Sequence, residues 1–170
     1  MHRRITAFAA VPLMAIALIA AACGGGSKSA SGSSGPAAKP SHTGGTASAA
    51  QVGVGKSGIG NVVVAPSGLT LYLFEKDAAG SSACYGSCAV DWPPLLTGSK
   101  PLAGMGIQSS LLGETRRHDG TEQVTYAGHP VYNFVGDATP GQTNGEGLEE
   151  FGGGWDALSP AGQKIEGGSQ

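Results

Sequence analysis

Two cysteines and two histidines are the side chains of this chain best suited to metal binding or redox chemistry: Cys84, Cys88, His118 and His129. Thiolates and imidazoles are the usual protein ligands of zinc, and His or Tyr can also ligate haem iron. The C-x-x-x-C spacing has no matching second pair, however, and structural zinc sites usually show tighter spacing. A transition-metal or haem site is therefore the alternative prediction, and the primary prediction is no cofactor.

The two cysteines are also suited to a structural disulfide. A catalytic dithiol is usually C-x-x-C at the start of a helix, where the helix dipole lowers the thiol pKa. Here three residues separate Cys84 from Cys88 within a Gly/Ser-rich loop. An exported chain, which the N-terminus indicates, favours pairing of the two thiols. Because the closed ring is short, the chain-entropy model gives the bond only about 2 kcal/mol.

Hydrolytic chemistry has little support in the sequence. The chain contains no G-x-S-x-G elbow, no P-loop and no His-Glu-x-x-His motif. Of its four histidines, His2 lies in the predicted signal peptide and His42 in a predicted tether, which leaves His118 and His129 as bases. We expect no enzyme, and a hydrolytic enzyme ranks third among the functions considered.

A repeated motif organises the elements that must position these residues. The string T-L-Y-L-F-E-K-D at 70–77 recurs as V-Y-N-F-V-G-D at 131–137, so that Y-x-F-x-x-D occurs twice. A Gly precedes each Tyr by four residues, and a Trp with a Leu three residues later follows each copy. The repeated residues are Tyr72, Phe74, Asp77 and Trp92, and then Tyr132, Phe134, Asp137 and Trp155. The sequence therefore predicts one unit present twice, at 52–100 and 101–162, before a C-terminal tail at 163–170.

Each unit is predicted to consist of short strands. The β-branched run 61–65 and the run 69–74 flank a Pro-Ser-Gly turn and predict a hairpin, and Asp119-Gly120 predicts a second hairpin between 113–118 and 121–126. In 69–74 both faces are apolar, which predicts a central strand covered on both sides. One unit alone has too few strands to be stable. The fold class predicted is all-β, with two tandem β-rich repeats packed into one small sandwich or barrel-like domain.

The roles expected for the motif residues are structural. The aromatic residues should meet in the core between the two repeats, and the Trp that precedes Pro93-Pro94 should lie over that core as a lid. Asp77 and Asp137 should accept backbone N–H groups two or three residues further on and so close turns. The alternative, a surface platform of aromatic rings for a ligand, is less common for aromatic residues at alternate strand positions.

The N-terminus predicts export and lipid anchoring. Basic residues precede a continuous apolar run that ends in L-I-A-A-A-C, with Cys23 as its last residue. This string resembles the bacterial lipobox, which implies a signal peptide at 1–22 and diacylglycerol on Cys23; an uncleaved anchor or ordinary secretion is the alternative. Residues 23–51 then form a Gly/Ser/Ala tether without large apolar residues. Cleavage removes Arg3 and Arg4 and changes the formal net charge from −2 to −4, so attraction to anionic lipid does not explain attachment.

The motifs together resemble the secreted-repeat lipoproteins of bacteria, predicted lipoproteins with a Y-x-[FWY]-x-x-D motif. The resemblance covers roughly 52–162 and also includes the string C-x-x-x-C-A-x-x-W-P-P-L from Cys84 to Leu95 and G-H-P-V-Y-N-F-V-G-D from Gly128 to Asp137. It implies export, lipidation and a repeated small β unit, and no assigned activity.

These observations favour a membrane-anchored, extracytoplasmic binding or interaction module whose partner is an envelope protein or small ligand. The low charge content and absence of a basic run argue against nucleic acid as a partner. The alternative is a metal- or haem-handling, redox-associated envelope protein.

Overall fold

The structure, a computed structural model, describes residues 48–166. The predicted signal peptide, Cys23 and the predicted tether as far as residue 47 lie outside the described residues. Within the described chain, short strands arranged in three sheets form a sandwich-like all-β domain, and the sheets do not close into a barrel. No helix in this range has the length and apolar content needed to cross a membrane.

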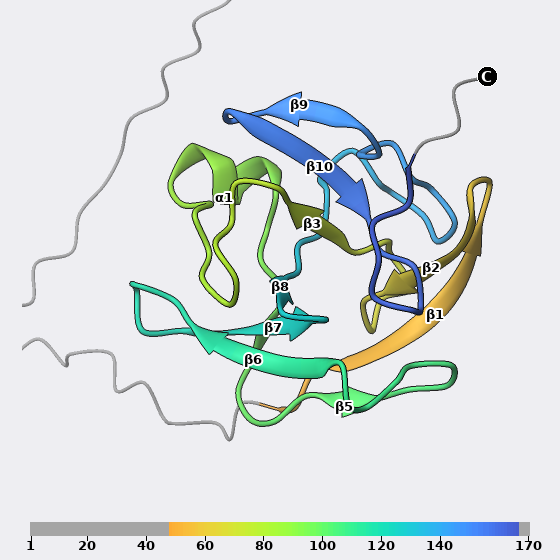
Figure 1. Cartoon of the computed structure of the whole chain (residues 1–170), viewed down its shortest axis with the longest axis horizontal. Coiled ribbons are helices and arrows are strands. Elements are labelled where there is room, and N and C mark those ends of the chain that lie inside the picture. The colour runs from red at the N-terminus through yellow and green to blue at the C-terminus, as the bar shows by residue number, and fades with distance from the viewer. Residues whose placement is uncertain (1–47, 167–170) are drawn as a thin grey trace, which may run out of the picture. The chain divides into compact units, whose positions relative to one another are not determined.

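The elements follow one another as short strands with a single short helix. They are β1 (Gln51–Ser57), β2 (Gly60–Val64), β3 (Tyr72–Phe74), α1 (Ser87–Asp91), β4 (Leu96–Thr97), β5 (Leu102–Ala103), β6 (Leu112–Arg116), β7 (Glu122–Tyr126), β8 (His129–Pro130), β9 (Leu148–Glu150) and β10 (Gly153–Ala157). In one sheet β1 lies between β2 and β5, in the second β10 lies between β3 and β9, and in the third β7 lies between β4 and β6 and also pairs with β8. Figure 1 shows the β9–β10 pair on the opposite side of the domain from β5 and β6.

Both repeats begin with an antiparallel hairpin and a tight turn. β1 pairs with β2, and β6 pairs with β7 around the predicted Asp119-Gly120 turn. The turns that follow place Gly68 at φ 84° and Gly128 at φ 82°, a left-handed conformation that glycine adopts without steric cost. The spacing of these two glycines before the motif strands therefore reflects the same backbone requirement in both repeats.

The two repeats exchange their C-terminal segments. Val63 N–H in the first repeat donates to Leu158 O in the second over 2.8 Å, and Val124 N–H in the second donates to Leu95 O in the first over 2.9 Å. At the centre, Tyr72 and Tyr132 exchange both of their backbone N–H···O bonds, at 2.9 and 3.0 Å. Because equivalent contacts recur with the repeats exchanged, an approximate two-fold axis relates them, and each Trp-bearing segment completes the sheet of the other repeat.

Two hydrophobic clusters lie on opposite faces of the motif strand. Leu71 and Leu73 point into an aliphatic cluster with Val63, Val124 and Leu158, whereas the motif aromatic residues form a second cluster with the two tryptophans. All four residues from Leu71 to Phe74 are buried, and β3 lies between β10 and Tyr132. The predicted central strand, covered on both faces, is confirmed.

Several local predictions need correction. The predicted hairpin of 61–65 with 69–74 is present around its turn, where Leu71 N–H donates to Val63 O and Ala65 N–H donates to Leu69 O, but β2 pairs over its full length with β1, which was not predicted. The cysteine loop contains the short helix α1, which ends at Asp91 before Pro93-Pro94. The C-terminal residues do not simply trail away as a tail, because Ile165 N–H donates to Ala157 O over 2.8 Å.

Candidate functional site

Four aromatic rings stack in one column across the two-fold axis. Trp92 and Trp155 lie face to face with centroids 3.9 Å apart and an interplanar angle of 7°. Each Trp stacks on the motif Phe of the other repeat, Phe74 on Trp155 at 4.1 Å and Phe134 on Trp92 at 4.3 Å. Both indoles are fully buried, so the prediction of Trp92 as a lid over the core is wrong: it is the centre of the core.

The motif tyrosines are held by the motif aspartates of the opposite repeat. Tyr72 OH donates to Asp137 Oδ2 over 2.6 Å, and Tyr132 OH donates to Asp77 Oδ2 over 2.8 Å. Each Tyr also meets a Trp edge-on, Tyr72 against Trp92 at 5.4 Å and Tyr132 against Trp155 at 5.2 Å. Burial, reinforced by the neighbouring carboxylate, raises the pKa of both phenols far above its ordinary value.

The second oxygen of each aspartate closes a turn, as predicted, but over a longer span. Asp77 Oδ1 accepts Ala83 N–H at 2.7 Å, and Asp137 Oδ1 accepts Asn144 N–H at 2.9 Å, so the acceptors reach six and seven residues onward. The Asp77 pKa is raised because burial disfavours the charged carboxylate, although the Ala83 N–H and the Tyr132 hydroxyl partly oppose this shift.

Cys84 and Cys88 form the predicted disulfide, with their Cα atoms 5.3 Å apart. Its loop is held by the buried Arg117, whose Nη2 donates to Cys84 O and whose Nη1 donates to Ser82 Oγ, both over 2.8 Å. Arg117 also lies over the Tyr85 ring, 4.3 Å from its centroid. Sequence reasoning missed Arg117, because its position between Arg116 and His118 gave no signal of burial.

The four residues of the alternative metal site are not assembled as ligands. The two sulfurs are joined to each other, the exposed His118 stacks on Tyr85 at 4.9 Å, and His129 lies at the start of β8. Within residues 48–166, no group of three or more His, Cys, Asp and Glu side chains is arranged to hold a metal ion. The chemistry of these positions is therefore that of a disulfide and two separate imidazoles.

A polar groove of about 600 Å³ opens where β3 ends. Phe74 and Leu73 form its floor, and its polar side chains come from distant parts of the chain, namely Glu75, Asp77, His129, Gln163 and Lys164. Lys164 Nζ lies 2.7 Å from Glu75 Oε1 and 3.8 Å from Asp156 Oδ2. That ion pair lowers the Glu75 pKa and raises the Lys164 pKa. The groove thus presents carboxylate, imidazole, amide and ammonium groups beside the buried motif core.

Comparison with known proteins places this arrangement in a family. A family model described as a secreted repeat of unknown function matches residues 53–96 and 114–159, together more than half of the chain. The chain belongs to the secreted-repeat family. The two matched segments each run from the first hairpin to the Trp-x-x-Leu segment, so the family repeat is the unit that the structure intertwines. No curated protein and no solved structure matches the chain.

Membership in the secreted-repeat family places the protein outside the cytoplasm. The motif residues that the two copies share, Tyr, Phe, Asp and Trp, are the ones that build the crossed core. Two of the groove residues differ between the copies. By their distance from the motif tyrosines, Glu75 corresponds to Val135 and His129 corresponds to Leu69. These two polar side chains are therefore not needed in both copies of the repeat.

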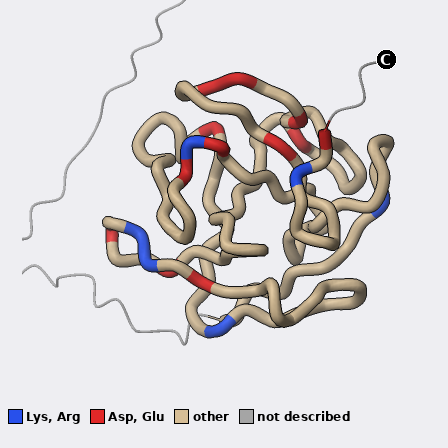
Figure 2. Tube along the Cα trace, viewed as in Figure 1, with Lys and Arg blue, Asp and Glu red and all other residues tan. Residues whose placement is uncertain are grey.

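Charge is distributed unevenly over this secreted-repeat domain. Residues 48–166 carry twelve Asp and Glu against six Lys and Arg. Figure 2 shows much of the acidic charge along β9 and β10 and in the adjoining loops, whereas the basic residues are scattered.

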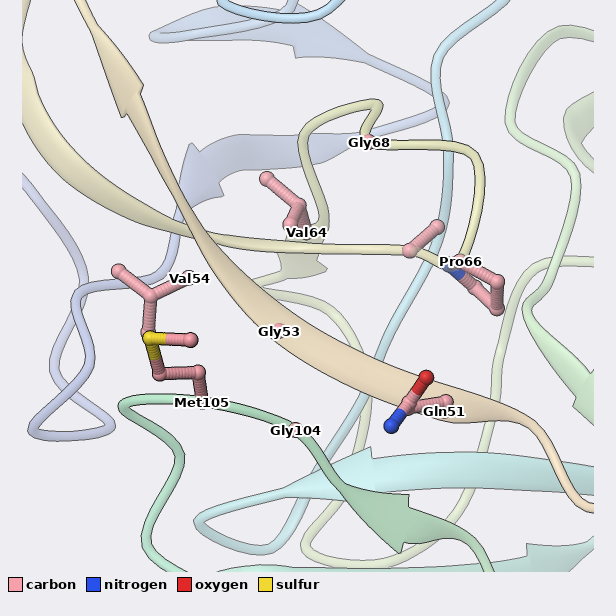
Figure 3. A pocket seen from close by; sticks show the side chains of 9 residues that line it. Gln51, Gly53, Val54, Val64, Pro66, Gly68, Gly104 and Met105 are labelled. Carbon is pink, nitrogen blue, oxygen red and sulfur yellow. The ribbon is translucent and has the colours of Figure 1, made fainter.

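A second, smaller hollow of about 270 Å³ lies along β1, between β2 with its following turn and the segment after β5. Figure 3 shows Val54 and Met105 side by side at one end and Gln51 at the other, with Gly53 and Gly104 between them. Only Gln51 contributes a polar side chain to this lining, so we take the groove at Asp77 and His129 as the candidate site.

Proposed function

We propose that the protein is a lipid-anchored extracytoplasmic binding module, and that the groove at Asp77 and His129 receives a small polar ligand or a short segment of an envelope partner. The intertwined core supplies a rigid support, because both repeats must be assembled before either sheet is complete. Preformed concave sites with a few convergent polar groups are the usual form of small-ligand sites.

The observation that carries this proposal is the difference between two equivalent faces. The first face has Glu75 and His129 where the second has Val135 and Leu69, while the crossed Tyr–Asp pairs are the same on both. Because the valine and leucine are compatible with the scaffold, the fold does not require this polar pair, although Glu75 forms an ion pair with Lys164. Glu75 and His129 are also exposed, so their replacement removes no buried contact.

A lipid on Cys23 supports this role by holding the module in place. Two acyl chains anchor a protein stably where one does not. The excess of acidic residues in the domain disfavours adhesion to an anionic lipid surface, so the groove would face the aqueous phase rather than the bilayer.

The groove can be tested by an NMR ligand screen on the domain. The probes are monosaccharides, amino acids and short amines, and the readout is amide shifts at 73–77, 129 and 162–164. Binding should be lost in the Glu75→Val, His129→Leu double variant, which copies the second face. It should be kept in Glu114→Gln, a control that removes one charge from the exposed surface of β6. Shifts that persist in the double variant, or no shifts at the groove with any probe, would contradict the proposal.

The anchor is tested separately by fractionation. Cys23→Ser should release the protein from the membrane fraction, because no thiol remains to carry the diacylglycerol. Retention of the variant in membranes after an alkaline wash would sink the lipid-anchor proposal while leaving the groove untouched.

A further inference from the structure

The aromatic core combines rings and proton acceptors in a way that packing alone does not require. Tyr126 shows the simpler arrangement, because this buried phenol donates to a backbone carbonyl, that of Pro160, over 2.7 Å. The two motif tyrosines instead have carboxylate acceptors, at 2.6 and 2.8 Å, and the Tyr132 hydroxyl also lies 2.7 Å from Ser82 Oγ. Desolvating a carboxylate is costly, and Asp137 is 4% exposed, whereas the carbonyl that serves Tyr126 carries no charge. The second oxygen of each aspartate also accepts a backbone N–H.

A carboxylate also serves one of the stacked indoles. Trp92 Nε1–H donates to Glu150 Oε2 over 2.9 Å, whereas Trp155 Nε1–H donates to the Glu150 carbonyl at 3.3 Å. One-electron oxidation of a phenol or an indole makes its O–H or N–H proton strongly acidic. Three of the four oxidisable rings, Tyr72, Tyr132 and Trp92, hold that proton in a hydrogen bond to a carboxylate. The rings themselves are in contact, with the indoles 3.9 Å apart and each phenol within 5.4 Å of an indole.

We propose that this cluster is a one-electron relay, in which the stacked tryptophans are oxidised and the motif tyrosines re-reduce them with proton transfer to the crossed aspartates. The oxidant is a one-electron acceptor such as a high-valent metal complex or an oxygen-centred radical, and it takes one electron from the Trp92–Trp155 pair. Stacking spreads the resulting positive charge over two indoles and so stabilises it.

The next step moves one electron and one proton in different directions. Tyr132 gives an electron to Trp155, its phenol O–H bond breaks, and the proton moves to Asp77 Oδ2, which leaves a neutral tyrosyl radical and a protonated carboxyl group. A quinol or enediol donor then supplies one electron to Tyr132, the proton returns from Asp77, and the proton of the donor is lost to solvent. The sum is one electron passed from donor to oxidant, with the protein unchanged.

Asp77 is the proton acceptor of the relay that solvent can reach. Asp77 is half-buried and lines the groove, whereas its counterpart Asp137 is buried. The Tyr132 branch is therefore the one that a donor can approach, and Tyr72 with Asp137 forms a closed branch. This role is independent of the ligand proposed for the groove.

Flash oxidation of the intact domain by photoexcited ruthenium tris-bipyridine with a cobalt(III) acceptor tests the relay. In the wild type the indole radical absorbance should convert into tyrosyl radical absorbance, more slowly in D₂O. Tyr72→Phe/Tyr132→Phe should lose the tyrosyl signal and prolong the indole radical, whereas Tyr126→Phe, the matched control, should behave as wild type. Absence of conversion in the wild type, or equal conversion in the double variant, would overturn the relay.

Folding of each variant must be checked separately, because a substitution in the core can prevent folding. The role of the carboxylates is then tested in aspartate variants. The exciton-coupled circular dichroism of the Trp92–Trp155 pair reports whether the column is intact in each variant. In folded Asp77→Asn, conversion should slow relative to wild type, because an amide is a poor proton acceptor. An unchanged conversion rate in both Asp77→Asn and Asp137→Asn would overturn the role of the aspartates as proton acceptors.

Discussion

The phenol of Tyr72 in the first repeat donates to the carboxylate of Asp137 in the second over 2.6 Å, and Tyr132 and Asp77 repeat the bond in the opposite direction. The motif Y-x-F-x-x-D is therefore completed between repeats and not within one. Its Tyr and Asp belong to different hydrogen-bonded pairs, and its Phe stacks on a Trp of the other copy. This crossing explains why the unit occurs twice in one chain.

The first prediction is that neither repeat folds alone. Fragments 48–104 and 105–166 each lack the Trp-bearing segment that completes their sheet, so each should show no dispersed amide spectrum by NMR. An equimolar mixture should recover the dispersed spectrum of the intact domain, because all exchanged contacts can form between two chains. A fragment that gives a native-like spectrum by itself would show that the repeats are independent.

The second prediction concerns the stability held in a crossed pair. Tyr72→Phe leaves the buried Asp137 carboxylate without its phenol and should lower the free energy of unfolding by about 1–3 kcal/mol. Asp137→Ala should cost at least as much, since it leaves the buried Tyr72 hydroxyl without its carboxylate acceptor and also removes the acceptor of Asn144 N–H. Urea denaturation of both single variants and the double variant gives the coupling energy. Strict additivity of the two losses would mean that the pair is not an energetic unit.

The third prediction is that two phenols resist ionisation. Burial raises the pKa of Tyr72 and Tyr132, so the neutral form stabilises the fold below the ordinary tyrosine pKa of about 10, and this contribution is lost as pH rises beyond it. Phenolate absorbance should therefore appear in two stages, the second coinciding with unfolding measured by circular dichroism. Tyr72→Phe/Tyr132→Phe should remove the second stage, and a single stage in the wild type would contradict the burial argument.

The fourth prediction concerns the disulfide. Cys84→Ser/Cys88→Ser should lower the free energy of unfolding by about 2 kcal/mol and leave the crossed core intact, because the ring is short and Arg117 still holds the loop. Thermal unfolding and the Trp exciton signal measure the two effects. Loss of the exciton signal in the folded variant would mean that the bond positions the core.

The repeated motif predicted which residues form the core better than it predicted which segments pair with one another. Alternation along 69–74 correctly separates Leu71 and Leu73 from Tyr72 and Phe74, because side chains on a strand alternate between faces. The exchange of Trp segments could not be predicted, since periodicity specifies which face is apolar and not which strand is the neighbour. For the same reason the sequence predicts Trp92, which precedes Pro93-Pro94, to be a lid over the core, although the side chain is fully buried at its centre.

The groove could not be predicted from local sequence patterns either. Glu75, His129 and Lys164 are separated by 35 or more residues along the chain, and only the crossed fold brings them together. His129 was considered as a ligand because of its residue type, and its place beside Asp77 follows from β8 meeting the end of β3. A comparison of the two repeats at Glu75/Val135 and His129/Leu69 was the available signal, because these positions differ where the motif does not.

The most direct test of the proposed binding role is photo-crosslinking in intact cells, with a photoreactive amino acid at Gln163 in the groove and, as control, at Glu114 on β6. We expect an adduct, identified by mass spectrometry, from position 163 alone, and we expect it to be lost when Glu75→Val and His129→Leu are added. No adduct at position 163, the same adduct from position 114, or an adduct that survives the double substitution would contradict the proposed binding role.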